Sequence, residues 1–72
     1  MRLTLSAKEE LLKSLRRSAH EELVAIAHYE KRASYAAKHD VSVLSTYKRI
    51  IKDEREHYRS FMIQITRIKQ LR

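Results

Sequence analysis

Apolar residues follow one another at alternating steps of three and four over two long stretches of the chain. This spacing places them on one face of a helix, so the sequence predicts two amphipathic helices. The first stripe comprises Leu12, Leu15, Ala19, Glu22, Ile26, Tyr29, Ala33 and Ala36, and the second comprises Val43, Tyr47, Ile50, Glu54, His57, Phe61, Gln64 and Ile68. Three ionisable residues, Glu22, Glu54 and His57, therefore interrupt two otherwise largely apolar faces.

The predicted helices are separated by one short turn. Ser6 and Glu9 in SAKE form a capping-box pattern, which predicts a first helix over residues 7–38. The segment KHDVS interrupts the apolar spacing, and its Asp40 is a good N-cap for a second helix over residues 41–70. A turn as short as about 39–40 makes the two helices antiparallel neighbours. The fold class is therefore all-α, an antiparallel two-helix hairpin.

Composition supports a single helical domain over residues 1–72. The chain has no glycine and no proline, which favours long helices with a minimum of turn. It also has no cysteine, so a disulfide framework and thiolate metal sites are excluded, and nothing marks a secreted protein. No run of about 18 apolar residues occurs, so neither a signal peptide nor a membrane span is expected. We expect a cytoplasmic protein.

Both stripes are too wide for the two helices to cover each other. The flanking apolar residues are Leu11, Leu23 and Ala25 on the first helix and Leu44, Ile51, Tyr58 and Ile65 on the second. A domain of this size rarely gains enough stability from one core alone. The sequence therefore predicts a homodimer in which two hairpins form a four-helix bundle about a two-fold axis.

The three ionisable stripe residues are predicted to lie at one height of the hairpin. Glu22 lies 16 residues before the predicted end of the first helix, and His57 lies 16 residues after the start of the second, with Glu54 one turn nearer the turn. Carboxylates in an apolar contact need a partner or a metal ion. If Glu22 and Glu54 simply paired with Arg55 or Arg59, their position on the stripe would remain unexplained.

Glu54 and His57 form a Glu-x-x-His pair, whose spacing lets both side chains grip one ion. Dimerisation would double the set to four glutamates and two histidines, the ligands of a di-iron or di-manganese carboxylate centre. These oxygen and nitrogen donors suit iron, two per dimer, with manganese or zinc as substitutes. Two Fe(II) ions bridged by carboxylates about 3.5 to 4 Å apart can pass electrons together to oxygen or peroxide. Glu22, Glu54 and His57 are therefore the predicted metal and catalytic residues of a ferroxidase.

Two segments carry a resemblance to a known family. EELVAIAHYEKRA (residues 21–33) and DEREHYRSFM (residues 53–62) resemble the iron-binding helices of the encapsulated ferritins and, more distantly, of rubrerythrins in the ferritin-like superfamily. The resemblance extends from about Leu15 to Ile68. It implies a ferroxidase centre at a two-fold dimer interface, in which Glu54 bridges two irons and Glu22 and His57 bind them at the ends.

The resemblance also carries expectations about assembly and marks departures. It implies iron storage, further assembly into a higher oligomer or ring, and an encapsulin nanocompartment as partner and location. His28 stands where the family commonly has tryptophan, and Val24 stands where an acid of the iron entry site is expected, so iron would enter by another route. The sequence ends at Arg72 without the family's following helix or an encapsulin-targeting tail.

Other polar residues receive weaker assignments. Tyr29, which matches a tyrosine near the centre in that family, and Tyr58 are candidates for hydrogen bonding to the ligands or for quenching oxidising equivalents, or are simply packed in the stripes. The remaining acids and histidines are expected on solvated faces. They are Glu21, Glu30, Asp53 and Glu56, and His20, His28 and His39.

The net charge of +7 supports an alternative function, a basic helical module that binds nucleic acid or an anionic protein. Antiparallel packing would bring the basic residues after Glu56 close to those of the first helix, although cations also complement helix C-termini. No fold motif supports nucleic-acid binding, so it is the lesser expectation. The residues are Arg59, Arg67, Lys69 and Arg72, with Lys8, Lys13, Arg16 and Arg17. A metal-free interaction bundle is a third alternative, and it would tolerate leucine at positions 22 and 54.

Overall fold

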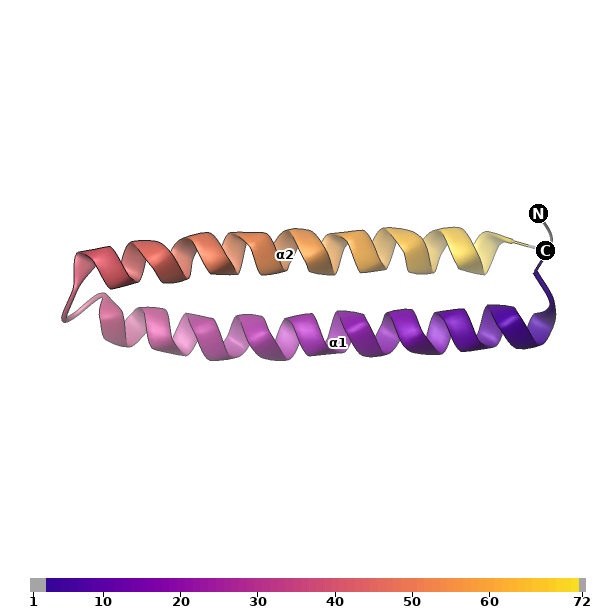
Figure 1. The fold of residues 1–72 in the computed structure, drawn as a ribbon, viewed down its shortest axis with the longest axis horizontal. Coiled ribbons are helices and arrows are strands. Elements are labelled where there is room, and N and C mark those ends of the chain that lie inside the picture. Colours follow the sequence, from indigo (N-terminus) through magenta and orange to yellow (C-terminus); the bar gives the residue numbers. More distant parts are fainter. Residues whose placement is uncertain (1–2, 72) are drawn as a thin grey trace.

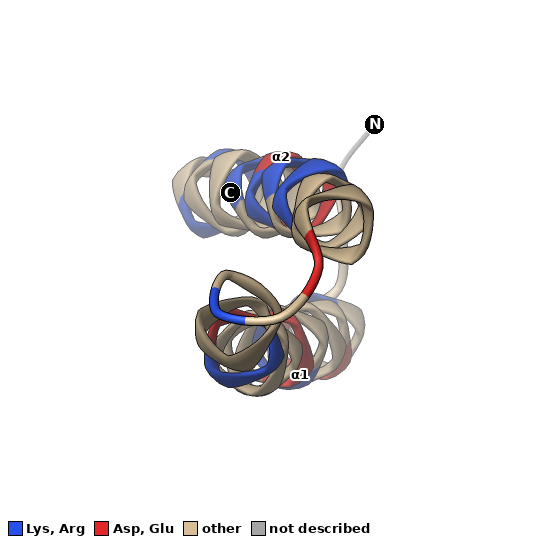
Figure 2. Cartoon of the chain, turned by 90° about the vertical axis from the view of Figure 1, so that its left-hand side faces the viewer, with Lys and Arg blue, Asp and Glu red and all other residues tan. Residues whose placement is uncertain are grey.

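The computed structural model describes residues 3–71, which form two long antiparallel helices. Helix α1 (Leu5–Ala36) and helix α2 (Val41–Gln70) lie side by side as a hairpin about 53 Å long, and the start of α1 and the end of α2 lie at the same end (Figure 1). The connection crosses between the helices at the opposite end, with Asp40 in it, as the view along the hairpin shows (Figure 2). The predicted all-α hairpin is confirmed.

The N-terminus of α1 differs from the prediction. The helix begins at Leu5, and its N-cap is Thr4, whose hydroxyl accepts a hydrogen bond from the Ala7 amide at 3.1 Å. The predicted Ser6 and Glu9 capping box is therefore wrong, because Ser6 already lies inside the helix. Threonine and serine are both good N-caps, so the spacing alone could not choose between Thr4 and Ser6.

The connection is longer than predicted, because α1 ends at Ala36 instead of Lys38. The amides of Ala37 and Asp40 donate to the carbonyls of Ala33 and Ala36, both at 2.8 Å, which closes the last turn of the helix. Helix α2 spans 41–70 as predicted, and Asp40 caps it by accepting from the Val43 amide at 3.0 Å.

The two helices bury a thin core of small and branched residues. Ala19, Ile26, Ala33 and Ala36 of α1 meet Ile51, Ile65 and Ile68 of α2. The alanines let the two backbones approach closely, and the isoleucines fill the remaining space. No large side chain within residues 3–71 is fully buried. Little apolar area is therefore removed from water by the hairpin alone.

The contact face of α2 is rotated from the predicted one. The row that faces α1 contains Leu44, Ile51, Tyr58 and Ile65, which the sequence analysis treated as a flank. Half of the predicted stripe is buried or half-buried as expected, namely Tyr47, Glu54, Phe61 and Ile68. The other half borders an open face, where Ile50 is half-buried and Val43, His57 and Gln64 are exposed. Burial of isoleucine and leucine is more favourable than burial of histidine and glutamine, so the more apolar row takes the contact. We call the row 43, 50, 57 and 64 the open row.

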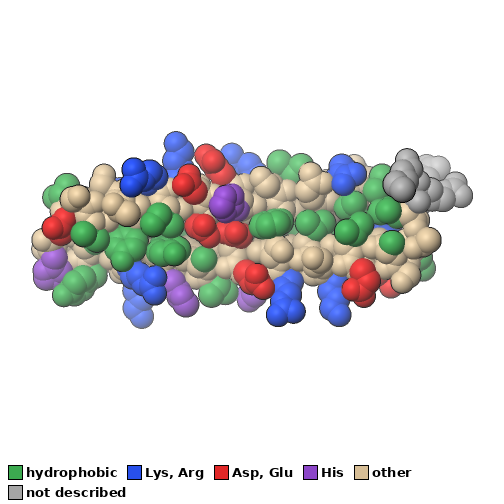
Figure 3. All heavy atoms as spheres, viewed as in Figure 1, with side chains coloured by type: hydrophobic (Ala, Val, Ile, Leu, Met, Phe, Trp, Pro, Cys, Tyr) green, Lys and Arg blue, Asp and Glu red, His purple; other side chains and the backbone are tan. Residues whose placement is uncertain are grey.

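The open face carries an apolar strip in the groove between the helices. Figure 3 shows this strip running along the molecule, with acidic side chains and a histidine interrupting it near the middle. Exposed apolar side chains elsewhere include Leu23, Met62 and Ile63. Neither helix is long and apolar enough to cross a membrane, within the part of the chain that the structure describes.

The N-cap of α2 provides a test of the fold. We expect Asp40→Ala to lower the free energy of unfolding by about 1 kcal/mol, because the Val43 amide loses its acceptor. Asp40→Asn keeps an acceptor oxygen and is the matched control, which should stay within a few tenths of a kcal/mol of the parent. Urea unfolding followed by circular dichroism measures both. Equal loss in the two variants would contradict the capping role.

Candidate metal centre

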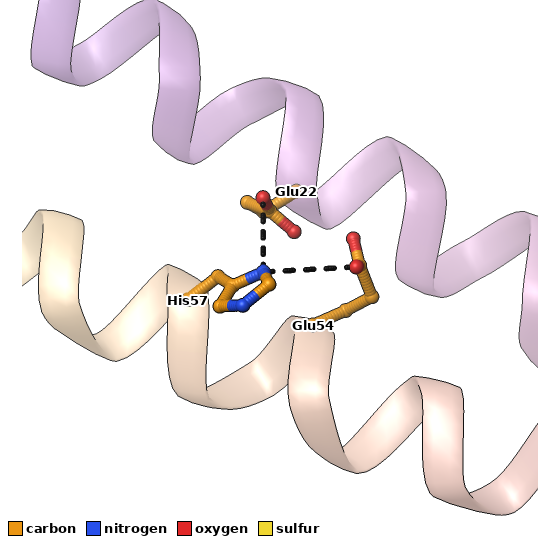
Figure 4. Close-up of side chains that lie close together, drawn as sticks. All are labelled: Glu22, Glu54 and His57. Atoms are coloured by element: carbon orange, nitrogen blue, oxygen red, sulfur yellow. Dashed lines mark ion pairs between the residues drawn. The ribbon is translucent and has the colours of Figure 1, made fainter.

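Glu22, Glu54 and His57 meet at mid-length of the hairpin, as their matched heights predicted. Glu22 comes from α1, and Glu54 and His57 come from successive turns of α2 (Figure 4). His57 Nδ1 lies 3.6 Å from Glu22 Oε1 and 3.7 Å from Glu54 Oε1. One ligand atom from each residue lies within 4.8 Å of the others. A single cation can therefore contact all three residues.

The two carboxylates are largely shielded from solvent, whereas the imidazole is not. The exposed fraction of the side chain is 18% for Glu22, 22% for Glu54 and 58% for His57. Glu22 Oε2 is buried and has no hydrogen-bond partner among the described residues. A buried carboxylate oxygen without a donor is unfavourable, so this atom calls for either a proton or a cation.

The electrostatics of the cluster favour binding of positive charge. Hydrogen bonding to Glu54, burial and the negative charge of Glu54 together raise the pKa of Glu22, and the neighbouring His57 lowers it in part. Two carboxylates this close repel each other when both are ionised. A divalent cation would relieve this repulsion, and its binding would release any proton that the pair holds.

The nearby arginines do not neutralise the cluster. Arg55 forms its ion pair with Glu30, at 3.6 Å, and Arg17 pairs with Glu21, at 3.3 Å. Among the ion pairs of residues 3–71, only the one with His57 involves Glu22. The alternative in which Arg55 or Arg59 partners the stripe acids is therefore not the arrangement observed.

The two candidate tyrosines lie in the packing around the core. Tyr29 stacks at a tilt on Tyr47, with ring centres 6.0 Å apart, and the Arg32 guanidinium lies 5.5 Å from the Tyr29 ring centre. Tyr58 is half-buried on the contact face of α2. Within the described part of the chain, neither tyrosine forms a hydrogen bond with the three cluster residues. Their part in any chemistry stays a prediction.

The remaining polar predictions concern the surface. Glu21, Glu30, Asp53 and Glu56, and the histidines 20, 28 and 39, are all exposed, as predicted. At the end of α2, Lys8 Nζ donates to the carbonyls of Lys69, at 3.1 Å, and Leu71, at 2.6 Å, so this cation caps the helix C-terminus. Arg72 lies outside the described residues.

The sequence analysis missed a row of basic residues on α2, because it grouped cations by their position along the hairpin. Lys48, Lys52, Arg55 and Arg59 follow one another at steps of four, three and four. The same spacing that revealed the apolar stripes would have revealed this row.

Comparison with family models, curated proteins and solved structures finds no match to this chain. The resemblance to the encapsulated ferritins therefore rests on the two segments quoted above and stays a prediction. What the structure adds is a set of two shielded carboxylates and one imidazole around a space that suits a cation.

The raised pKa of Glu22 predicts how stability depends on pH in the presence of a chelator. Between the ordinary glutamate pKa, about 4.3, and the raised value, the folded chain binds more protons than the unfolded chain. The free energy of unfolding should therefore fall as the pH rises through this range. Urea unfolding between about pH 4 and pH 7 measures this change.

Glu22→Gln should remove this share of the pH dependence, because glutamine does not titrate. Glu10→Gln, a substitution at an exposed position on α1, is the matched control and should keep the parent's profile. Identical pH profiles for the parent and Glu22→Gln would show that folding does not raise the pKa of Glu22.

Proposed function

We propose that the protein is a ferroxidase that oxidises Fe(II) to Fe(III) at a two-iron site formed between two copies of the chain. The observation that carries this proposal is the mid-hairpin cluster, in which Glu22 leaves a buried oxygen without a partner beside Glu54 and His57. Iron is the substrate of this reaction. Each Fe(II) gives up one electron, and oxygen or peroxide accepts the electrons.

The ligand types favour iron. Carboxylate oxygens and one imidazole per metal suit Fe(II) and Mn(II), whereas structural zinc sites more often contain thiolates, which this chain lacks. Manganese and zinc would compete for the same ligands. In a single hairpin the exposure of His57 at the open face gives ions a direct route from solvent to the cluster, before a second copy covers that face.

One chain supplies too few ligands for two irons, so the proposed site needs a second copy. The cluster opens on the face that also holds the apolar strip, where Leu15, Ile50 and Phe61 are only half-buried. Thirteen residues of α2 precede Glu54 and thirteen follow His57, so the cluster lies at the centre of the helix. A two-fold axis through the cluster would therefore let two hairpins overlap along their whole length and cover the strip.

The roles of the residues are taken from the resemblance. Glu54 would bridge the irons, while Glu22 and His57 would bind at the ends. The four carboxylates of a dimer would balance the charge of two divalent ions in full, and oxidation would then leave an excess positive charge on the site. Ferric product would then be available for storage, inside an encapsulin shell if the resemblance extends that far.

Iron titration tests the proposal. Under anaerobic conditions we expect one tightly bound Fe(II) per chain, followed by rapid oxidation when air is admitted. Glu54→Gln should weaken binding at least about tenfold and abolish the rapid phase, because it removes the bridging carboxylate. Glu56→Gln changes an exposed acid two residues away and should behave like the parent. Absence of Fe(II) binding by the parent, or equal rates in both variants, would refute the ferroxidase assignment.

Sedimentation equilibrium tests the dimer. We expect a particle of twice the chain mass of 8.6 kDa. Ile50→Asp places a charge in the open row and should shift the equilibrium to monomer by at least about tenfold. Ile63→Asp makes the same change at an exposed position outside the open face, and it should leave the dimer intact. A monomeric parent, or equal dissociation of the two variants, would contradict the interface.

A further inference from the structure

Helix α2 carries a row of four cations on the side away from the metal cluster. Lys48, Lys52, Arg55 and Arg59 are all exposed and fall within an arc of about 60° on a helical wheel. We call them the basic row. It is about 16 Å long at the rise of an α-helix. Arg55 and His57 are two residues apart and so point in nearly opposite directions, which puts the row and the cluster on different faces.

Most of this positive charge is not neutralised. Arg55 pairs with Glu30 of α1 at 3.6 Å, but among residues 3–71 Lys48, Lys52 and Arg59 form no ion pair. Figure 2 shows the basic segments of α2 gathered along its left and upper sides. Since the whole chain has a net charge of +7, no remote excess of acid offsets the row.

A hollow of about 450 Å³ opens beside the row, between the two helices. Its floor is apolar, with Ala33 and Ile51, and its polar rim is formed by Ser34, Lys48, Arg55 and Glu30. The serine hydroxyl, the ammonium and the guanidinium are all donors, which is the combination that recognises a phosphate group. Glu30 is the one rim group that would repel it.

We propose that the basic row and this hollow bind the sugar-phosphate backbone of nucleic acid without reading base sequence. One phosphate occupies the hollow, and the phosphates beside it contact Lys52 and Arg59. Cations in a straight row suit a partner whose negative charges repeat along its length. Contacts of the four cations with phosphate oxygens would position the backbone and carry no sequence information.

The observations favour nucleic acid over two other anionic partners. Protein interfaces are built around buried aromatic and aliphatic anchors, and none lies among the four cations. A membrane surface would need a continuous apolar face beside the charges, whereas the exposed apolar side chains beside the row, Met62 and Ile63, lie only at its Arg59 end. This activity does not depend on the proposed iron chemistry, because the residues lie on different faces.

Fluorescence anisotropy with a labelled mixed-sequence DNA duplex tests the proposal, with a chelator present to exclude metals. For the parent, the slope of log K against log salt concentration should be about −2.7 or steeper, which corresponds to the neutralisation of three phosphates. The combined variant Lys48→Gln, Lys52→Gln and Arg59→Gln should lose at least about tenfold in affinity and nearly all of this slope. The matched control Lys13→Gln, Lys31→Gln and Lys38→Gln removes the same charge from exposed positions outside α2. Its affinity for the duplex should stay within about threefold of the parent's.

A second variant tests the same surface by a gain of affinity. Glu30→Gln removes the repelling carboxylate and releases Arg55, so it should bind the duplex more tightly than Glu10→Gln, which changes the net charge equally. Glu54→Gln should leave DNA binding unchanged, which separates this inference from the ferroxidase. No binding by the parent, equal loss in the two triple variants, or equal competition by polyglutamate and unlabelled duplex would overturn the proposal.

Discussion

The proposed chemistry of this hairpin depends on a carboxylate placed where the two helices meet. Glu22 lies in the apolar stripe of α1 and faces Glu54 and His57, and its Oε2 atom is buried without a donor. Leucine at this position would pack more favourably, because a paired carboxylate buried in such a contact seldom stabilises a protein more than a hydrophobic residue does. The cluster therefore lowers the stability of the isolated chain at neutral pH, and a bound cation would reverse that loss.

The rest of the core contributes little to the stability of the chain. Its buried residues are alanines and isoleucines, and the open row leaves Val43 and His57 in contact with water. A chain of 72 residues with such a thin core needs an additional source of stability. A second copy and a metal ion are the two sources that the open face can accommodate, and both would act at the same place. Folding, pairing and ion binding would then be coupled, so that each strengthens the others.

The sequence predicted the helices and the cluster well because both depend on local spacing. The stripe of α1 and the start of α2 follow from period and capping alone. The rotation of α2 was not predicted, because rows 43/50/57/64 and 44/51/58/65 are adjacent and the first row also carries two apolar residues, Val43 and Ile50. Whether the row with Val43 or the row with Leu44 packs against α1 depends on how well each one fits the surface of α1. The Thr4 cap was missed for a similar reason, since two good caps lie two residues apart.

Helix α2 serves three purposes through three rows that share one period. Ile51 and Ile65 hold it to α1, His57 faces the open groove beside Glu54, and Lys48, Lys52 and Arg59 face solvent on the far side. The contact and open rows recur at every seventh residue and the basic row at steps of three and four, so a one-residue insertion would rotate the residues after it by about 100° and take the rows out of register. The proposed functions would therefore require an unbroken helix. The absence of glycine and proline from the chain is consistent with that requirement, because either residue within α2 would weaken or bend the helix that keeps the rows in register.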